Sequence, residues 1–293
     1  MYKEVTLDPD CFNDFSYYIL LQNSFGPEKG RFLSVSKRNW IQETFQIVKN
    51  SQLGEVKKKS IKHFLNKLQK DKTQNVILLN DSRQLVGKEQ VQKWLDWHKV
   101  QHAFAPFDLI ISERLEQHFW SNGTFNDNEN WVVPPSKLVR RDANEYLKQL
   151  VPILNFSKSI FLVDPYIPIP NNDFVKSLIT QSQKLGVKQI TIFTSINNPD
   201  FQNVLKKISK EITVNITFKV VVVRSKFSVI HDRYLFSECA AIKSSHGFTE
   251  KATTGELTDN TSFSLVGKDE IDLVRNRLQL FEKENVDCVY SLE

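Results

Sequence analysis

IHDRYLFSECAAIKSSHGFT, residues 230–249, is the stretch that decides our interpretation of the fold and its chemistry. His231 and Arg233 are two residues apart, Glu238 follows after four more residues, and a serine pair ending at Ser245 comes soon afterwards. Alternate side chains of an extended segment share one face, so the imidazole and the guanidinium are expected to point the same way. An imidazole can attack phosphorus, and a guanidinium binds phosphate oxygens through a planar fork of donors. The pattern therefore indicates a phosphodiester site that needs no metal ion.

This order of residues resembles the HKD motif of the phospholipase D superfamily, H-x-K-x4-D-x6-G-S-x-N. The resemblance continues upstream in two strand-like segments, SIFLVDPYI (159–167) and FKVVVVRS (218–225), and it covers roughly residues 140–293. It implies an α/β fold, with a phospholipase D-like C-terminal domain in which helices flank a mixed sheet.

The resemblance also implies roles for single residues. His231 would be the nucleophile that forms a phosphohistidine, Arg233 and Ser245 would hold the phosphate, and Glu238 would be the orienting acid. No cofactor and no metal ion are implied. The activity expected on this basis is that of a metal-independent phosphodiesterase, specifically a nuclease, and such small proteins resemble components of bacterial antiviral defence.

The chain departs from the family motif at several positions. Arg233 replaces Lys, Glu238 replaces Asp, Ser244 replaces Gly, and Gly247 stands where Asn is expected. One residue is missing between the acid and the serine. The H-D-R opening is also similar to the phospholipase D-like domain C-terminal to MIT modules, which is a binding domain without hydrolytic residues. A degenerate module that binds nucleic acid, lipid head groups or a protein partner is therefore the alternative function.

A third interpretation is that the C-terminal half is an unrelated α/β domain, such as a nucleotide-binding module. The chain has nine glycines, and none is spaced as GxGxxG or GxxxxGK[ST]. The absence of a glycine-rich phosphate loop argues against this third interpretation.

The chain contains a single copy of the HKD-like motif. Phosphotransfer through histidine needs an acid for the leaving oxygen, and family members with one motif obtain it by pairing two chains. A twofold interface would bring His231 from each chain together, so we expect a homodimer. His246 is the other candidate for the acid, although its position favours an exposed loop residue.

Asp164 and Tyr166 lie directly after an apolar segment, in VDPYI. Ligand-binding residues of open α/β sheets gather at the carboxyl ends of strands, so both side chains are candidate substrate contacts. The alternatives are a turn-forming Asp before Pro and a tyrosine that only packs.

Positive charge is concentrated in one part of a chain whose net charge is only +5. Residues 31–72 hold eleven Lys or Arg against three acids, and a run of lysines that includes Lys58 and Lys62 lies along one expected helix. Such a helix is typical of a surface that contacts phosphate backbones, so nucleic acid is the expected partner. A solvated helix face is the alternative.

Three cysteines, Cys11, Cys239 and Cys288, are too far apart in sequence for a zinc site or a disulfide framework, which favours a reducing cytoplasm. Charged residues interrupt the N-terminal apolar positions and the segment 150–170, so neither a signal peptide nor a membrane span is expected. We therefore expect a cytoplasmic protein that is not integral to the membrane.

The clearest boundary is the Gly-, Asn-, Asp- and Pro-rich segment 121–137, where Trp131 could dock onto one domain. We divide the chain into a helix-rich N-terminal domain (1–122) that binds substrate or a protein partner, a linker (123–137) and the phospholipase D-like domain (138–293). In the last, strands alternate with helices at 141–153, 173–186, 199–212 and 268–284, which predicts a mainly parallel sheet covered on both faces. In the N-terminal domain we expect helices at 38–50, 55–70 and 88–100 and short strands at 75–80 and 107–112.

Overall fold

The structure is a computed structural model of the 293-residue chain. It describes residues 1–72, 76–78, 83, 93–115, 131–169, 172–196, 203, 216–223, 232–250, 259–284 and 288–292, with side chains as far as residue 280. The chain divides into two compact units, residues 2–134 and residues 135–293 together with Met1. The division therefore falls inside the segment 123–137 that the sequence marks as a linker.

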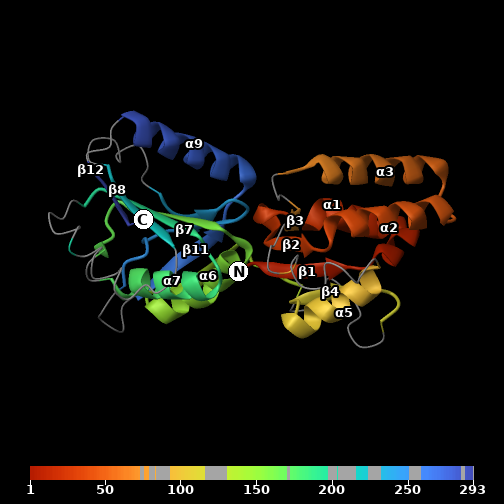
Figure 1. Ribbon diagram of the computed structural model, residues 1–293, viewed down its shortest axis with the longest axis horizontal. Coiled ribbons are helices and arrows are strands. Elements are labelled where there is room, and N and C mark those ends of the chain that lie inside the picture. Colours follow the sequence, from red (N-terminus) through yellow and green to blue (C-terminus); the bar gives the residue numbers. More distant parts are fainter. Residues whose placement is uncertain are drawn as a thin grey trace. The chain divides into compact units, whose positions relative to one another are not determined.

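The N-terminal unit is built on a parallel sheet with the strand order β3-β2-β1-β4. The strands are β1 (Lys3–Leu7), β2 (Arg31–Ser34), β3 (Ile77–Leu78) and β4 (Leu109–Ile111). Figure 1 shows helices on both sides of this sheet, with α1, α2 and α3 on one side and α5 on the other. These helices are α1 (Phe15–Ser24), α2 (Lys37–Asn50), α3 (Glu55–Lys70) and α5 (Trp94–Phe104), and two short 3-10 turns lie at Pro9–Asn13 and Pro27–Lys29.

The sequence did not reveal strand β1, because a charged residue interrupts its apolar pattern. Glu4 is buried within KEVTL, where Arg83 binds it through Nε at 2.5 Å from Oε1. The same guanidinium lies over the Phe107 ring, with Cζ 4.0 Å from the ring centroid. A charge can be buried on a strand when it is paired and hydrogen-bonded in this way.

Trp131 docks onto the N-terminal unit, as its position in the linker suggested. Its ring is buried and lies under the Arg31 guanidinium, with Cζ 4.1 Å from the ring centroid. Arg31 Nε also donates to the Trp131 carbonyl oxygen at 3.0 Å. Burial lowers the pKa of Arg31 to about 10.

The C-terminal unit contains a mixed sheet with the strand order β12-β8-β7-β6-β9-β10-β11-β5. Only the β6–β7 and β7–β8 pairs are parallel among the described strands. The other five pairs are antiparallel, so the expectation of a mainly parallel sheet was wrong. The strands are β5 (Ser136–Arg140), β6 (Ser159–Val163), β7 (Gln189–Thr194), β8 (Thr217–Val222), β9 (Arg233–Ser237), β10 (Ala241–Ser244), β11 (Asn260–Leu265) and β12 (Cys288–Leu292).

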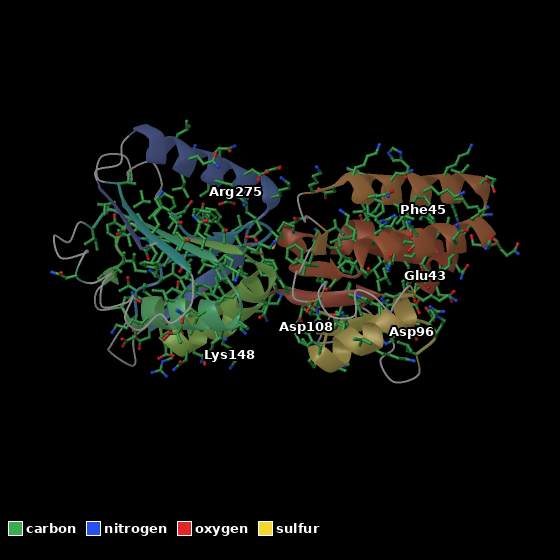
Figure 2. The ribbon with its side chains drawn as sticks, viewed as in Figure 1. Glu43, Phe45, Asp96, Asp108, Lys148 and Arg275 are labelled. Carbon is green, nitrogen blue, oxygen red and sulfur yellow. The ribbon has the colours of Figure 1, made fainter. Side chains whose placement is uncertain are left out.

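Helices cover both faces of this mixed sheet, as Figure 1 shows. Helices α6 (Ala143–Phe156) and α7 (Asp173–Lys184) lie on one face, and α9 (Lys268–Glu284) lies on the other. Arg275 of α9, labelled in Figure 2, ties this helix to β9 because its Nη2 donates to the Ser237 carbonyl oxygen at 2.8 Å. The three elements match the expected helices closely, whereas the helix expected at 199–212 lies outside the described residues except for Asn203.

Both units are α/β, which confirms the fold class predicted from the sequence. Strands β5 and β12 were not expected, and β5 begins inside the segment that we assigned to the linker. β5 is an edge strand with mostly exposed side chains, so it carries no buried apolar pattern that could mark it. Among the helices described, none combines the length and apolar character that crossing a membrane would require.

Candidate functional site

The hairpin of β9 and β10 brings residues from separate parts of the sequence together at the strand ends on one side of the mixed sheet. Arg233, the first residue of β9, is the register partner of Ser244, the last residue of β10. Strand β9 also runs antiparallel to β6, with Tyr234 opposite Val163. The start of β9, the end of β10 and the carboxyl end of β6 therefore meet, and Asp164 follows β6 directly at this point.

Side chains around Arg233 alternate between the two faces of the sheet, as expected for extended structure. Asp232 Oδ2 accepts a hydrogen bond from Lys243 Nζ at 2.7 Å and lies 3.1 Å from Tyr234 Oη. Tyr234 in turn donates to Glu270 of α9 at 2.7 Å. These residues therefore lie on the α9 face, and Arg233 points to the opposite face.

The Arg233 side chain lies beside Tyr166 and the loop after β10. Its Cζ is 5.4 Å from the Tyr166 ring centroid, and its Nη1 donates to the Ser245 carbonyl oxygen at 3.2 Å. Tyr166 is 62% exposed, so the ring and the guanidinium form a surface that solvent reaches. The predicted candidates Arg233, Asp164 and Tyr166 are thus brought together, whereas His231 lies outside the described residues.

Asp164 is buried beneath this surface, with an exposed fraction of 1%. Its Oδ1 accepts from the Tyr166 backbone N–H at 3.0 Å, and its Oδ2 accepts from the Phe248 N–H at 2.8 Å. Burial raises the pKa of Asp164, while the two amides and the nearby Arg233 charge act in the opposite direction. The carboxylate is therefore hydrogen-bonded mainly by backbone, and no described contact ties the Arg233 guanidinium directly to it.

Gly247 is required by the close packing around Asp164. Its φ of 81° is in the left-handed region, and an added Cβ would lie 2.4 Å from Asp164 Oδ2 and 3.3 Å from Arg233 Cδ. An Asn at this position, as in the family motif, would collide with the buried carboxylate. The buried Asp164 carboxylate therefore explains why this chain has Gly247 where the family motif has Asn.

The serine hydroxyls of the loop are used in fixing its shape. Ser244 Oγ donates to the Gly247 carbonyl oxygen at 2.7 Å and lies 2.9 Å from Thr261 Oγ1. Ser245 Oγ is 3.2 Å from Thr261 Oγ1 and accepts from the Ser262 N–H at 2.9 Å. Ser245 is exposed beside Arg233, but the hydroxyl that we expected to hold phosphate is already engaged.

Glu238 does not join the Arg233 cluster, which corrects its expected place in the site. It follows the far end of β9, and its carboxylate accepts from the backbone N–H groups of Lys158 at 2.6 Å and Ser159 at 3.3 Å. Four residues of extended chain separate it from Arg233. Its visible role is to bind the backbone at the start of β6.

The remaining predicted residues have plain structural surroundings. His246 is exposed in the loop, where its backbone N–H donates to Thr261 Oγ1 at 3.1 Å. Lys58 is largely covered, with Nζ 3.4 Å from the Lys49 carbonyl oxygen and 3.6 Å from Glu55 Oε1. Lys62 is half-buried. The exposed lysines of α3 are Lys57, Lys59, Lys67 and Lys70.

Arg141 is a residue of the site that the sequence analysis did not single out. Its Nε and Nη2 donate to the Thr249 carbonyl oxygen at 3.1 and 3.0 Å, and its charge acts to lower the pKa of Asp164. Tyr146 Oη donates to the same carbonyl at 3.4 Å, and burial raises its pKa to about 12. The only signal for Arg141 was the pair of arginines, Arg140 and Arg141, at the start of the helix expected at 141–153.

Within the part of the chain that the structure describes, no cluster of three or more His, Cys, Asp or Glu side chains could hold a metal ion. The cluster around Arg233 instead offers a cation and an aromatic ring.

Comparisons with known proteins add little to this geometry. No protein-family model matches the chain, and no curated protein matches it. A solved structure of TrmBL2, an archaeal chromatin protein described as showing a novel mode of DNA binding, is similar with a TM-score of 0.31 and 12% sequence identity. The similarity covers 53% of this chain, which spans about half (55%) of that protein's length. A likeness at this level carries no inference about fold or function.

Proposed function

We propose that the protein is a metal-independent phosphodiesterase of the phospholipase D type that acts on nucleic acid. The observation that supports this proposal best is the half-buried Arg233 guanidinium, which lies beside the exposed Tyr166 ring where β6, β9 and β10 meet. Guanidinium groups bind phosphate oxygens through paired N–H donors, and the neighbouring Tyr166 ring can stack on a base. Among the described residues, Arg233 makes no ion pair that would compete with a phosphate.

The chemistry proposed for this site starts at His231, two residues before Arg233. The neutral imidazole attacks phosphorus, a P–O bond breaks, and the leaving oxygen takes a proton from a general acid. Water then hydrolyses the phosphohistidine and regenerates the imidazole. Arg233 stabilises the charge on the phosphoryl oxygens throughout these steps.

In this proposal the general acid is His231 of a second copy of the chain. A homodimer would place two such rings at one pocket, with one deprotonated and one protonated. When inactive His231→Ala chains are mixed with wild type, mixed dimers lose one of the two roles, so activity should fall below that given by dilution. If activity follows simple dilution instead, His246 becomes the candidate acid within one chain.

A binding module without hydrolytic activity is the second candidate function. Two observations favour it: the Ser245 hydroxyl is engaged by Thr261 and Ser262, and Gly247 stands where the motif has Asn. Both changes remove donors that would hold a phosphate during reaction. In this case Arg233 and Tyr166 would still bind a strand.

Incubation with DNA and RNA in excess EDTA distinguishes the two candidates. The phosphodiesterase proposal expects cleavage that His231→Ala abolishes and that Arg233→Ala strongly reduces. Binding that depends on Arg233 without any cleavage would support the binding module. Cleavage that survives His231→Ala would overturn the proposed mechanism.

A further inference from the structure

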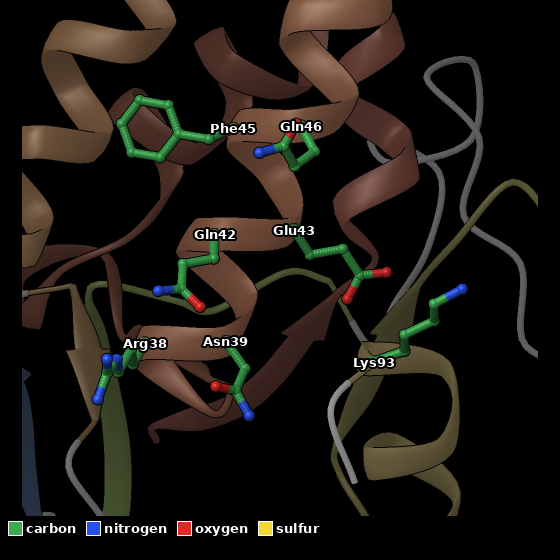
Figure 3. Close-up of a pocket in the computed structure, with 7 residues that line it drawn as sticks. All are labelled: Arg38, Asn39, Gln42, Glu43, Phe45, Gln46 and Lys93. Carbon is green, nitrogen blue, oxygen red and sulfur yellow. The ribbon is translucent and has the colours of Figure 1, made fainter.

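A polar pocket of about 740 Å³ lies in the N-terminal unit, beside α2. Figure 3 shows its lining, which comes from α2 and from Lys93, the residue before α5. The residues from α2 are Arg38, Asn39, Gln42, Glu43, Phe45 and Gln46.

The pocket lies toward the carboxyl edge of the parallel sheet. Helix α2 begins shortly after β2 ends, so its first turn is at this edge. The Trp40 indole of α2 donates to the carbonyl oxygen of Leu7, the last residue of β1, at 2.6 Å. The Trp94 indole of α5 donates to Thr6 Oγ1 at 2.9 Å. Ligands of open α/β sheets bind at this edge of the sheet.

The walls of the pocket are held in place by buried contacts. Trp40 and Trp94 are 1% and 2% exposed, and Glu43 Oε2 accepts from the Trp94 backbone N–H at 2.8 Å. This bond links α2 to the N-terminus of α5, where a negative charge is favoured by the helix dipole. Two cations, Arg38 and Lys93, face the single carboxylate of Glu43, so the lining carries a net positive charge.

The lining has the chemistry of a nucleotide site. The side-chain amides of Gln42 and Gln46 can both donate and accept hydrogen bonds, which suits the edge of a base. Arg38 and Lys93 suit a phosphate. A single carboxylate and a single apolar residue suit neither a metal ion nor a lipid tail. The volume lies within the range of roughly 300–1,000 Å³ that is usual for small-molecule sites.

We propose that this pocket binds a nucleoside phosphate, with the amides on the base and Arg38 and Lys93 on the phosphate. The surrounding residues 31–72 hold eleven Lys or Arg against three acids, and this positive field attracts a polyanion. The ligand favoured is therefore a nucleotide within a strand. The inference stands on the N-terminal unit and does not require activity at Arg233.

Binding of a short fluorescein-labelled DNA strand to the full chain, followed by anisotropy in EDTA, tests the proposal. Arg38→Ala should weaken binding about tenfold, and Gln42→Ala about threefold. Lys49→Ala is the matched control, because it removes the same charge from an exposed position of α2 outside the pocket. It should change the affinity by less than about twofold. Thermal unfolding of each variant shows whether the fold is intact.

Competition with unlabelled adenosine monophosphate distinguishes the two sources of the ligand. Displacement of the strand shows that a free nucleotide also fills the pocket, whereas Arg38-dependent binding without displacement restricts the ligand to strands. Equal effects of Arg38→Ala and Lys49→Ala, with none from Gln42→Ala, would overturn the proposal and leave only general charge attraction. Absence of any binding would also overturn it. Loss of cleavage alone bears on Arg233 and not on this pocket.

Discussion

In each of the two sheets, a central strand is followed by the same dipeptide, Asp-Pro. The two aspartate carboxylates have different hydrogen-bond partners. Asp8-Pro9 follows β1, and Asp164-Pro165 follows β6. Both aspartates are buried, and each accepts a 3.0 Å hydrogen bond at Oδ1 from the backbone N–H two residues later. This shared turn explains why Asp precedes Pro at both strand ends.

The difference lies in the remaining partners of the two carboxylates. Arg114 binds Asp8 through two N–H groups, Nε at 2.9 Å from Oδ2 and Nη2 at 2.6 Å from Oδ1, and Ser112 Oγ donates at 2.7 Å. Asp164 instead uses a second backbone amide. Among the described residues, an arginine therefore pairs with the aspartate after β1 but not with the aspartate after β6, and this difference is why we propose Arg233 as a phosphate ligand.

The largest expected change in stability tests the end of β1, where Arg114 pairs with Asp8. Arg114→Ala leaves the buried Asp8 charge without its main partner, so unfolding free energy should fall by about 3 kcal/mol. Urea denaturation of the full chain measures this change. A loss below about 1 kcal/mol would mean that Ser112 and the backbone satisfy Asp8 without the arginine.

Gly247→Ala tests the tight packing against Asp164 at the end of β6. Left-handed φ and contact with Asp164 should together cost about 3 kcal/mol of unfolding free energy. Gly186→Ala is the matched control, since Gly186 has a φ of 79° but no atom within 4 Å of an added Cβ. It should cost only about 1 kcal/mol. Equal losses in the two variants would show that Asp164 does not press on residue 247.

Asp164→Asn tests the raised pKa of the buried carboxyl. Burial raises this pKa, so the folded state holds the proton more tightly than the unfolded chain. The resulting stability is present in acid and is lost as the pH rises through the folded pKa. Unfolding free energies over a pH series should therefore show wild type losing stability relative to Asp164→Asn across that window. Parallel curves for the two proteins would contradict the assignment.

Arg233→Ala should have the smallest effect on stability. Among the described residues, the guanidinium makes one hydrogen bond, to the Ser245 carbonyl oxygen, so the unfolding free energy should change by less than about 0.5 kcal/mol. Urea denaturation beside Arg114→Ala gives the comparison directly. A loss as large as that of Arg114→Ala would make Arg233 a structural residue.

Several parts of this arrangement could be predicted from the sequence. Continuous apolar runs marked β6, β7 and β8, and helical periodicity marked α6, α7 and α9. The spacing of Arg233 and the position of Asp164 after an apolar segment were enough to select both residues. Asp232 and Arg233 point to opposite faces, as alternation requires.

The rest depended on tertiary contacts that periodicity does not encode. Glu4 sits within a buried strand because Arg83 reaches it from far along the chain. Glu238 matches the spacing of the motif, but the length of β9 carries it to the opposite end of the sheet from Arg233. The engagement of Ser245 by Thr261 arises because β10 pairs with β11, and the sequence did not predict which strands would pair.

The salt dependence of strand binding tests the central claim most directly. The slope of log affinity against log salt counts the phosphates that the protein neutralises, whichever other surfaces the strand touches. If Arg233, beside the end of β6, binds one phosphate of the strand, Arg233→Ala should reduce the magnitude of the slope by about 1. Lys148→Ala, which removes an exposed charge of α6, should leave the slope unchanged. An unchanged slope and affinity in Arg233→Ala would contradict the account.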